Sequence, residues 1–299
     1  MEAYTAACQN LRVAELAERV DELRANQTNG GSWLARRAVE ALLAVVEEPA
    51  ATNDELLGRL LDAGRELASA RPSQGAIAAA VGRLVASAHA ASHLPPAELQ
   101  RMVAEEANAL VAGRDRAAAS IAVHLAPMVA DATVLTHSAS ATVREAVIHG
   151  SPAHVLCTVS APYEEGRLLA DELRSEGVAA EVVEDDRVAD GLASASLVLV
   201  GADTVYEDGS VKNKIGTRAL AEGAAAHGVR VLVACELLKL APAAPPAQED
   251  EPELRDLTPP ELIDGIVTEE GITSPEDVLP VIDRTPFLRD GYRLLFGDG

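Results

Sequence analysis

The second half of this chain alternates short apolar runs with amphipathic segments, and this alternation restricts the fold more than any other feature. Runs of strand length, rich in Val and Leu, occur at residues 132–137, 154–160, 179–184, 197–202 and 229–235. Segments with helical spacing lie between most of them, at residues 141–149, 164–176 and 216–227. Buried strands that alternate with helices predict a parallel sheet with both faces covered. Such sheets bind ligands at the carboxyl ends of their strands.

The first half has a helical pattern instead. Apolar residues recur at three- and four-residue steps from Val13 through Leu16 to Val20 and beyond, which predicts helices with one apolar face. Asn53 is placed to cap one of these helices. The predicted fold is therefore α/β, with a helical N-terminal domain at residues 1–128 and a Rossmann-like, doubly wound parallel sheet at residues 129–299. A further strand is expected at residues 265–268, and an acidic, Pro/Ala-rich surface loop at residues 241–256.

The charge of the chain excludes several classes of partner. There are 47 acidic and 25 basic residues, a formal net charge of −22. Such a surface repels nucleic-acid backbones, so direct nucleic-acid binding is not expected. A high-salt cytoplasm favours an acid-rich, lysine-poor composition, because the salt screens the repulsion between the acidic side chains. We therefore interpret the composition as a halophilic adaptation. No uncharged apolar stretch approaches the ~20 residues that cross a bilayer, so a cytoplasmic protein without membrane contact is predicted.

The three cysteines give no sign of a metal or disulfide site. Cys8, Cys157 and Cys235 are far apart and lack ligand spacing. Cys157 and Cys235 lie in apolar runs, where buried, inert thiols are expected. Neither a metal nor another cofactor is predicted.

The first strand of the predicted sheet ends in small hydroxyl residues. Ser138, Ser140 and Thr142 stand where this strand turns into a helix. Backbone N–H groups at such a turn can converge on an anion, helped by the helix dipole. Ordinary helix capping is the alternative, and taken alone it is the commoner role of Ser and Thr at this position.

Two later strand ends carry the only lysines of the chain. Asp203 follows the fourth strand and is followed by the pair Asn213-Lys214, with Lys212 nearby. The fifth strand ends in Glu236, with Lys239 three residues on. Asn can donate to a phosphate or hydroxyl and Lys supplies a point charge, so this concentration predicts a phosphate-binding site.

At these residues the chain resembles a known family. The stretches 201–205 (Gly-Ala-Asp-Thr-Val) and 213–217 (Asn-Lys-Ile-Gly-Thr) are similar to the signature shared by three groups of proteins. These are the translation initiation factor 2B α/β/δ subunits, ribose-1,5-bisphosphate isomerase and methylthioribose-1-phosphate isomerase. The resemblance extends in the same order to residues 135–138, 236–239, 257–264 and 268–271. It implies a helical domain before a Rossmann-like domain that can hold a sugar phosphate.

The resemblance also implies a site, from which this chain departs at two places. The isomerases use a cysteine after the Thr-His pair together with the aspartate of Gly-Ala-Asp. Asp203 matches the aspartate, but the cysteine position is Ser138, a far weaker acid. Without the thiol, the alternative role of Asp203 is to hydrogen-bond backbone amides or to pair with Lys214 and shape the pocket. The isomerases also carry an Arg-Gly loop that contacts phosphate, and the corresponding stretch here contains Gly30 and Gly31 without the arginine. Neighbouring strand residues point to opposite faces, so a dyad of Ser138 and His137 is not expected.

The favoured function is therefore that of an initiation factor 2B-like subunit, in translation regulation or metabolite sensing, without isomerase activity. Its ligand would be a sugar phosphate or nucleotide. The resemblance implies a homodimer or higher oligomer through the C-terminal domain, with an initiation factor as a further partner. The alternative is an intramolecular aldose–ketose isomerase of the ribose-1,5-bisphosphate isomerase type. A metabolite sensor unrelated to translation is a third possibility.

The predicted ligand-binding residues are Gly30, Gly31, Ser138, Ser140, Thr142, Asn213, Lys214, Glu236 and Lys239, and the candidate catalytic residues are Asp203 and Ser138.

Overall fold

A computed structural model describes residues 15–26, 29–243 and 254–297. Its contacts divide the chain into a helical unit, up to Gly113 and again from Thr285, and a sheet unit from Arg114 to Arg284. The division falls inside the long helix α5 (Pro96–Val129), upstream of the boundary expected at residue 128. It also returns the last residues to the helical unit. Among the helices in the described ranges, none is long and apolar enough to span a membrane.

The helical unit is built around the Ala-rich helix α4 (Gly75–Ala90), which is almost wholly buried. It packs against α2 (Gly31–Val46), α3 (Asn53–Ala70) and α11 (Leu288–Phe296). A Cβ atom on Gly82 would lie 3.0 Å from the carbonyl carbon of Gly291, so glycine lets α4 and α11 approach backbone to backbone. The predicted cap of α3 is one residue off. Thr52, not Asn53, accepts the hydrogen bond from the Glu55 amide, 3.2 Å away, while Asn53 begins the helix.

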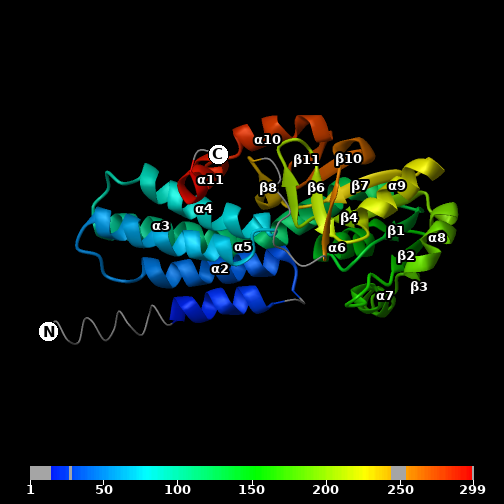
Figure 1. Ribbon diagram of the computed structural model, residues 1–299, viewed down its shortest axis with the longest axis horizontal. Coiled ribbons are helices and arrows are strands. Elements are labelled where there is room, and N and C mark those ends of the chain that lie inside the picture. Colours follow the sequence, from blue (N-terminus) through cyan, green and yellow to red (C-terminus); the bar gives the residue numbers. More distant parts are fainter. Residues whose placement is uncertain (1–14, 27–28, 244–253, 298–299) are drawn as a thin grey trace. The chain divides into compact units, whose positions relative to one another are not determined.

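The sheet unit contains a seven-stranded sheet in which only β11 runs antiparallel to its neighbour (Figure 1). The six predicted strands are all present in it. In spatial order the strands are β11 (Gly271–Thr273), β10 (Gly265–Thr268), β7 (Arg230–Ala234), β4 (Leu197–Gly201), β1 (Thr133–Thr136), β2 (His154–Thr158) and β3 (Ala180–Val183).

Helices cover both faces of this sheet. On one face α6 (Ala141–Gly150) packs with α7 (Glu165–Ser175), and on the other α8 (Val188–Ser194) packs with α9 (Thr217–His227). The core between sheet and helices is made of small branched side chains, as a chain with 2% aromatic residues requires. Cys157 and Cys235 are buried, as predicted, and burial raises the pKa of each thiol to about 12. That these thiols are inert stays a prediction. Cys8 lies outside the described residues.

The order of the strands reverses once along the chain. After β1 the chain builds β2 and β3 on one side, and then returns to add β4, β7 and β10 on the other. The reversal leaves the carboxyl ends of β1 and β4 side by side, the position at which doubly wound sheets bind ligands. The predicted residues Ser138 and Asp203 directly follow these two strands.

A second, four-stranded sheet begins immediately after β4 and was not predicted. Its spatial order is β8 (Leu240–Ala241), β5 (Thr204–Tyr206), β6 (Val211–Lys214) and β9 (Arg255–Thr258). Asn213 and Lys214 therefore lie on a strand, not on a turn into a helix. The expected loop at 241–256 is wrong at its ends, where β8 and β9 pair with this sheet, and residues 244–253 lie outside the described residues.

Candidate functional site at the carboxyl ends of β1 and β4

His137, the first residue after β1, is buried and links three segments of the sheet unit by hydrogen bonds. Its Nδ1 lies 2.7 Å from Thr158 Oγ1, and its Nε2 lies 2.7 Å from the carbonyl oxygen of Ile215. A carbonyl only accepts, so we assign the proton to Nε2 and let Nδ1 accept from the Thr158 hydroxyl. Burial lowers the pKa of His137, which favours this neutral form. His137 thus ties β1 to β2 and to the turn after β6, and it makes no hydrogen bond with the Ser138 side chain among the described contacts.

Two glycines let the ends of β4 and β6 lie close to the turn after β1. Gly216 has a φ of +101°, and a Cβ atom there would lie 2.9 Å from the imidazole Nε2 of His137. A Cβ atom on Gly201 would lie 2.6 Å from Ser140 Oγ. Both separations are shorter than real Cβ atoms adopt, so any other residue would push the ends of β4 and β6 away from β1.

The hydroxyl turn after β1 is already used by the protein. Ser138 has a φ of +65°, and its backbone N–H donates to Ser160 Oγ at 2.7 Å. Ser140 is the N-cap of α6, where its Oγ accepts from the Val143 amide at 3.4 Å. Thr142 is buried in the first turn of α6. The capping alternative therefore describes Ser140, and anion binding by this turn stays a prediction.

Four side chains meet at the end of β6: those of Ser138, Tyr163, Glu165 and Lys214. We call them the Lys214 cluster. Glu165 Oε1 accepts from Lys214 Nζ at 2.9 Å and from Ser138 Oγ at 3.0 Å. The Lys214 ammonium also lies 4.8 Å from the centre of the Tyr163 ring, a cation–π contact. The Lys214 side chain is only 6% exposed, and that of Glu165 22%. The structure thus brings together two predicted residues, Ser138 and Lys214, through a carboxylate that was not predicted.

Asp203 has a different partner from the one considered. Its side chain forms an ion pair with Arg255 on β9, and its backbone N–H donates to the Lys212 carbonyl at 3.0 Å. Pairing of Asp203 with Lys214 is therefore wrong, because Lys214 is paired with Glu165. The side chains of Asp203 and Arg255 are 14% and 19% exposed, so this ion pair is largely withdrawn from water.

The start of α9 is occupied by another carboxylate of the chain. Asp256 accepts from the amides of Gly216 at 2.7 Å and Arg218 at 3.2 Å. Burial raises the pKa of Asp256. Asn213 donates to Thr217 Oγ1 at 3.1 Å, and the Thr217 hydroxyl donates to the Lys214 carbonyl at 2.6 Å. Asn213 therefore shapes the turn from β6 into α9.

The remaining predicted residues lie at two other places. Glu236 and Lys239 are buried after β7, around the short 3-10 helix η2 (Leu237–Lys239). Nearby, the carboxylate of Glu269 accepts from the Leu237 amide at 2.9 Å, and burial raises the pKa of Glu269. Gly30 and Gly31 form the start of α2 in the helical unit. A ligand role for these four residues stays a prediction.

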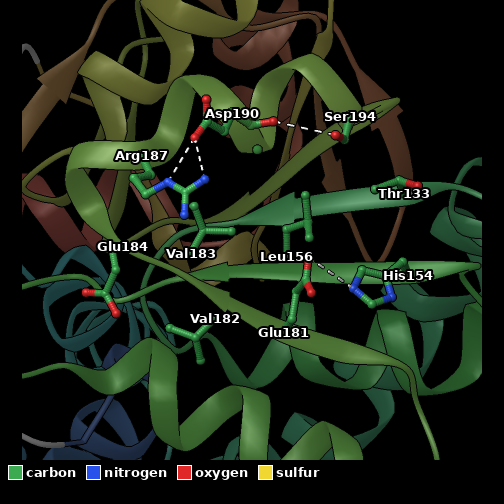
Figure 2. A pocket seen from close by; sticks show the side chains of 11 residues that line it. Thr133, His154, Leu156, Glu181, Val182, Val183, Glu184, Arg187, Asp190 and Ser194 are labelled. Atoms are coloured by element: carbon green, nitrogen blue, oxygen red, sulfur yellow. Dashed lines mark hydrogen bonds and ion pairs between the residues drawn. The ribbon is translucent and has the colours of Figure 1, made fainter.

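A cavity of about 440 Å³ on the sheet unit is separate from all of these residues (Figure 2). It lies between β3 and α8, and its charged side chains are already engaged: Arg187 with Asp190 at 2.8 Å, and His154 with Glu181 at 3.6 Å. Figure 2 shows the two side chains of each pair pointing toward each other. None of the predicted site residues lines it. Within the part of the chain that the structure describes, no group of three or more His, Cys, Asp or Glu could hold a metal ion.

Sequence reasoning missed Glu165, Arg255 and Asp256. Glu165 carried a weak signal, since it opens the helix after β2, a parallel neighbour of β1 whose carboxyl end meets the same edge of the sheet. Arg255 and Asp256 carried none, because they belong to the segment that was expected to be a loop.

Comparison with known proteins identifies the family of this chain. The model of the Initiation factor 2 subunit family matches residues 27–257. A protein of Pyrococcus abyssi named as a putative translation initiation factor eIF-2B subunit 2-like protein is 33% identical over 282 residues, which cover 88% of this chain and 97% of that protein. A ribose 1,5-bisphosphate isomerase of Haloferax volcanii is 28% identical over 315 residues, covering 95% and 94%.

Solved structures confirm the fold. A chain in the crystal structure of the tetrameric eIF2B-beta2-delta2 complex from C. thermophilum matches with a TM-score of 0.77 and 21% identity, over 91% of this chain and 96% of that one. The predicted α/β architecture, with N-terminal helices and a mostly parallel central sheet, is therefore correct. The matched residues include both signature stretches around Asp203 and Lys214, and the chain belongs to the Initiation factor 2 subunit family.

Proposed function

We propose that this protein is an initiation factor 2B-like subunit that binds a sugar phosphate or nucleotide at the Lys214 cluster, without isomerase turnover. The observation that carries the proposal is the convergence of Ser138 and Lys214 on a single anionic oxygen, at the strand ends where the fold places ligands. Two donors that share one carboxylate oxygen can equally hold a phosphate oxygen. The chain acts in the cytoplasm, in translation regulation or metabolite sensing.

A second candidate is supported by the isomerase relative. The similarity to the ribose 1,5-bisphosphate isomerase of Haloferax volcanii covers 95% of this chain, so a change of function within the same fold would require few residues. Asp203 matches the aspartate of that enzyme's family signature, whereas Ser138 replaces its cysteine. We therefore rank isomerase activity second.

Self-association is part of the proposal. Proteins of this family occur in multi-subunit complexes such as the tetrameric eIF2B-beta2-delta2 assembly, and two-fold association is the commonest closed arrangement of identical chains. We propose a homodimer or higher oligomer through the C-terminal domain, with an initiation factor as a further partner. Light scattering at high salt measures the mass of the assembly.

Replacing Lys214 with alanine tests the binding site. We expect Lys214→Ala to weaken binding of ribose-1,5-bisphosphate or AMP by ~1–3 kcal/mol, roughly 5- to 150-fold, because the ligand loses a charge-assisted hydrogen bond. Titration calorimetry at high salt measures the change. Arg218→Ala is the matched control, since it removes a positive charge from the adjoining helix α9. The Arg218 side chain pairs with Glu222 and not with Glu165. Equal affinities in Lys214→Ala and wild type would place the site elsewhere.

Salt dependence tests the proposed halophilic adaptation. With a net charge of −22, the melting temperature is expected to rise between 0.1 M and molar potassium chloride, because the Debye length falls from ~10 Å to ~3 Å over that range. Trehalose at equal osmolality is the control, because it stabilises proteins by exclusion without screening charge. A melting temperature that stays flat or falls with salt contradicts the adaptation.

A further inference from the structure

We infer that Glu165 is a built-in competitor for the phosphate of the ligand: its carboxylate holds Lys214 and Ser138 in the free protein and gives them up when a phosphate monoester binds. The inference rests on the proposed function, because it concerns the same site. Glu165 Oε1 accepts from both donors, at 2.9 Å and 3.0 Å. The carboxylate thus stands where an oxygen of the phosphate would be held.

Only one of the two carboxylate oxygens of Glu165 is hydrogen-bonded within the described residues. Its second oxygen, Oε2, is buried and has no hydrogen-bond partner among the described residues. A buried acceptor without a partner costs free energy, which is recovered when the side chain swings into water. The side chain already reaches water, since it is 22% exposed, and it belongs to the first residue of α7.

Asp256 shows the contrasting arrangement at the start of α9. Both of its oxygens accept backbone hydrogen bonds, Oδ2 from Gly216 at 2.7 Å and Oδ1 from Arg218 at 3.3 Å. Both oxygens of this carboxylate are thus engaged by backbone amides at the start of α9. Glu165, by contrast, is bound through a single oxygen to two side chains that a ligand could take over.

The competition selects the chemical class of the ligand. A phosphate monoester carries close to two negative charges at neutral pH and three strong acceptor oxygens, whereas the Glu165 carboxylate carries one charge and uses one oxygen here. A dianionic phosphate can therefore displace Glu165 from Lys214 and Ser138, while a neutral sugar or a singly charged carboxylate ligand gains too little. Glu165 is in this sense a specificity-determining residue for phosphate monoesters.

The test compares two isosteric substitutions at adjacent positions. Glu165→Gln removes the competing charge, and Glu164→Gln removes the same charge from a side chain that is 59% exposed and pairs with Arg167. With ribose-1,5-bisphosphate as the probe in titration calorimetry, we expect Glu165→Gln to tighten binding about tenfold, because like-charge repulsion next to the phosphate is removed. Glu164→Gln should stay within about twofold of wild type.

Each outcome bears on one proposal. If Lys214→Ala weakens binding but Glu165→Gln binds no more tightly than wild type, the competitor role is wrong and the phosphate site stands. If Glu165→Gln binds more weakly, Glu165 is a ligand contact instead. If no form of the protein binds the probe, both proposals fail. Glu165→Ala, which also removes the competing charge, gives the same comparison should Glu165→Gln not fold, and tighter binding is again the expected result.

Discussion

Replacing Gly166 with alanine is expected to destabilise the sheet unit by at least about 3 kcal/mol, the upper end of the cost of overpacking. Gly166 lies in the first turn of α7, where its N–H donates to the Val159 carbonyl at 3.2 Å. A Cβ atom there would overlap the carbonyl oxygen of Thr158, far inside the 3.0 Å that real Cβ atoms respect. That oxygen belongs to the backbone of β2 and cannot rotate away, so α7 or β2 must shift.

The expected change is large enough to measure by calorimetry. For a unit of this size a loss of about 3 kcal/mol lowers the melting temperature by roughly 6–12 °C. Gly58→Ala is the control. Gly58 lies within α3 with nothing near its missing Cβ atom, so alanine there should be neutral or stabilising by up to about 1 kcal/mol. A Gly166→Ala protein that melts within about 2 °C of wild type would show that α7 is not seated on β2 as described.

The consequence extends to the proposed ligand site. Glu165 precedes Gly166, and Ser160, which holds the Ser138 amide, stands at the end of β2. Movement of α7 away from β2 therefore separates the parts of the Lys214 cluster. The tight contact at Gly166 is what brings a carboxylate from α7 to a lysine on β6.

The parallel sheet was predictable because its strands carry a local signal. Residues 197–201 and 230–234 are continuous Val/Leu-rich runs, as strands buried on both faces must be, and their lengths distinguish them from helices. The position of the site followed from the same pattern, since Ser138 and Asp203 come directly after strands that the fold places side by side.

The second sheet was not predictable from local pattern. Strand β6 has the sequence Val-Lys-Asn-Lys, which resembles a polar turn, yet all four residues are buried. It forms a strand because β5 pairs with it on one side and β9 on the other. Strand β9 is about forty residues away in the chain, and its first residue, Arg255, pairs with Lys214, the last residue of β6. Burial of lysines there depends on partners such as Glu165 that only the folded chain supplies.

The side-chain partners within the site were likewise beyond local reasoning. Asp203 and Lys214 are close in sequence and opposite in charge, which suggested that they pair. Each instead has a partner from a distant segment, Arg255 for Asp203 and Glu165 for Lys214. Ion pairs of this kind are set by the three-dimensional packing of elements, for which spacing along the chain gives no rule.

The unaltered protein is expected to show no isomerase turnover on ribose-1,5-bisphosphate, even where this compound binds. Moving a proton between adjacent sugar carbons needs a group that gives and accepts a proton near neutral pH. A hydroxyl is about as weak an acid as water and a far weaker acid than a carboxylic acid. Proton transfer from a serine hydroxyl to a carboxylate is thus strongly uphill. The contact between Ser138 and Glu165 therefore does not replace the thiol of the isomerases.

The second half of an isomerase pair is also engaged. Asp203 is held in an ion pair with Arg255, which restrains its side chain. We expect NMR of the protein with ribose-1,5-bisphosphate in D₂O to show neither product nor deuterium incorporation above buffer, while the Haloferax volcanii isomerase, run in parallel, converts the sample. Ser138→Cys, which returns the family's thiol, is the variant in which turnover should first appear. Turnover by the unaltered protein that Asp203→Asn abolishes would overturn the regulatory proposal, because it would mean that Asp203 works with a proton shuttle other than a thiol.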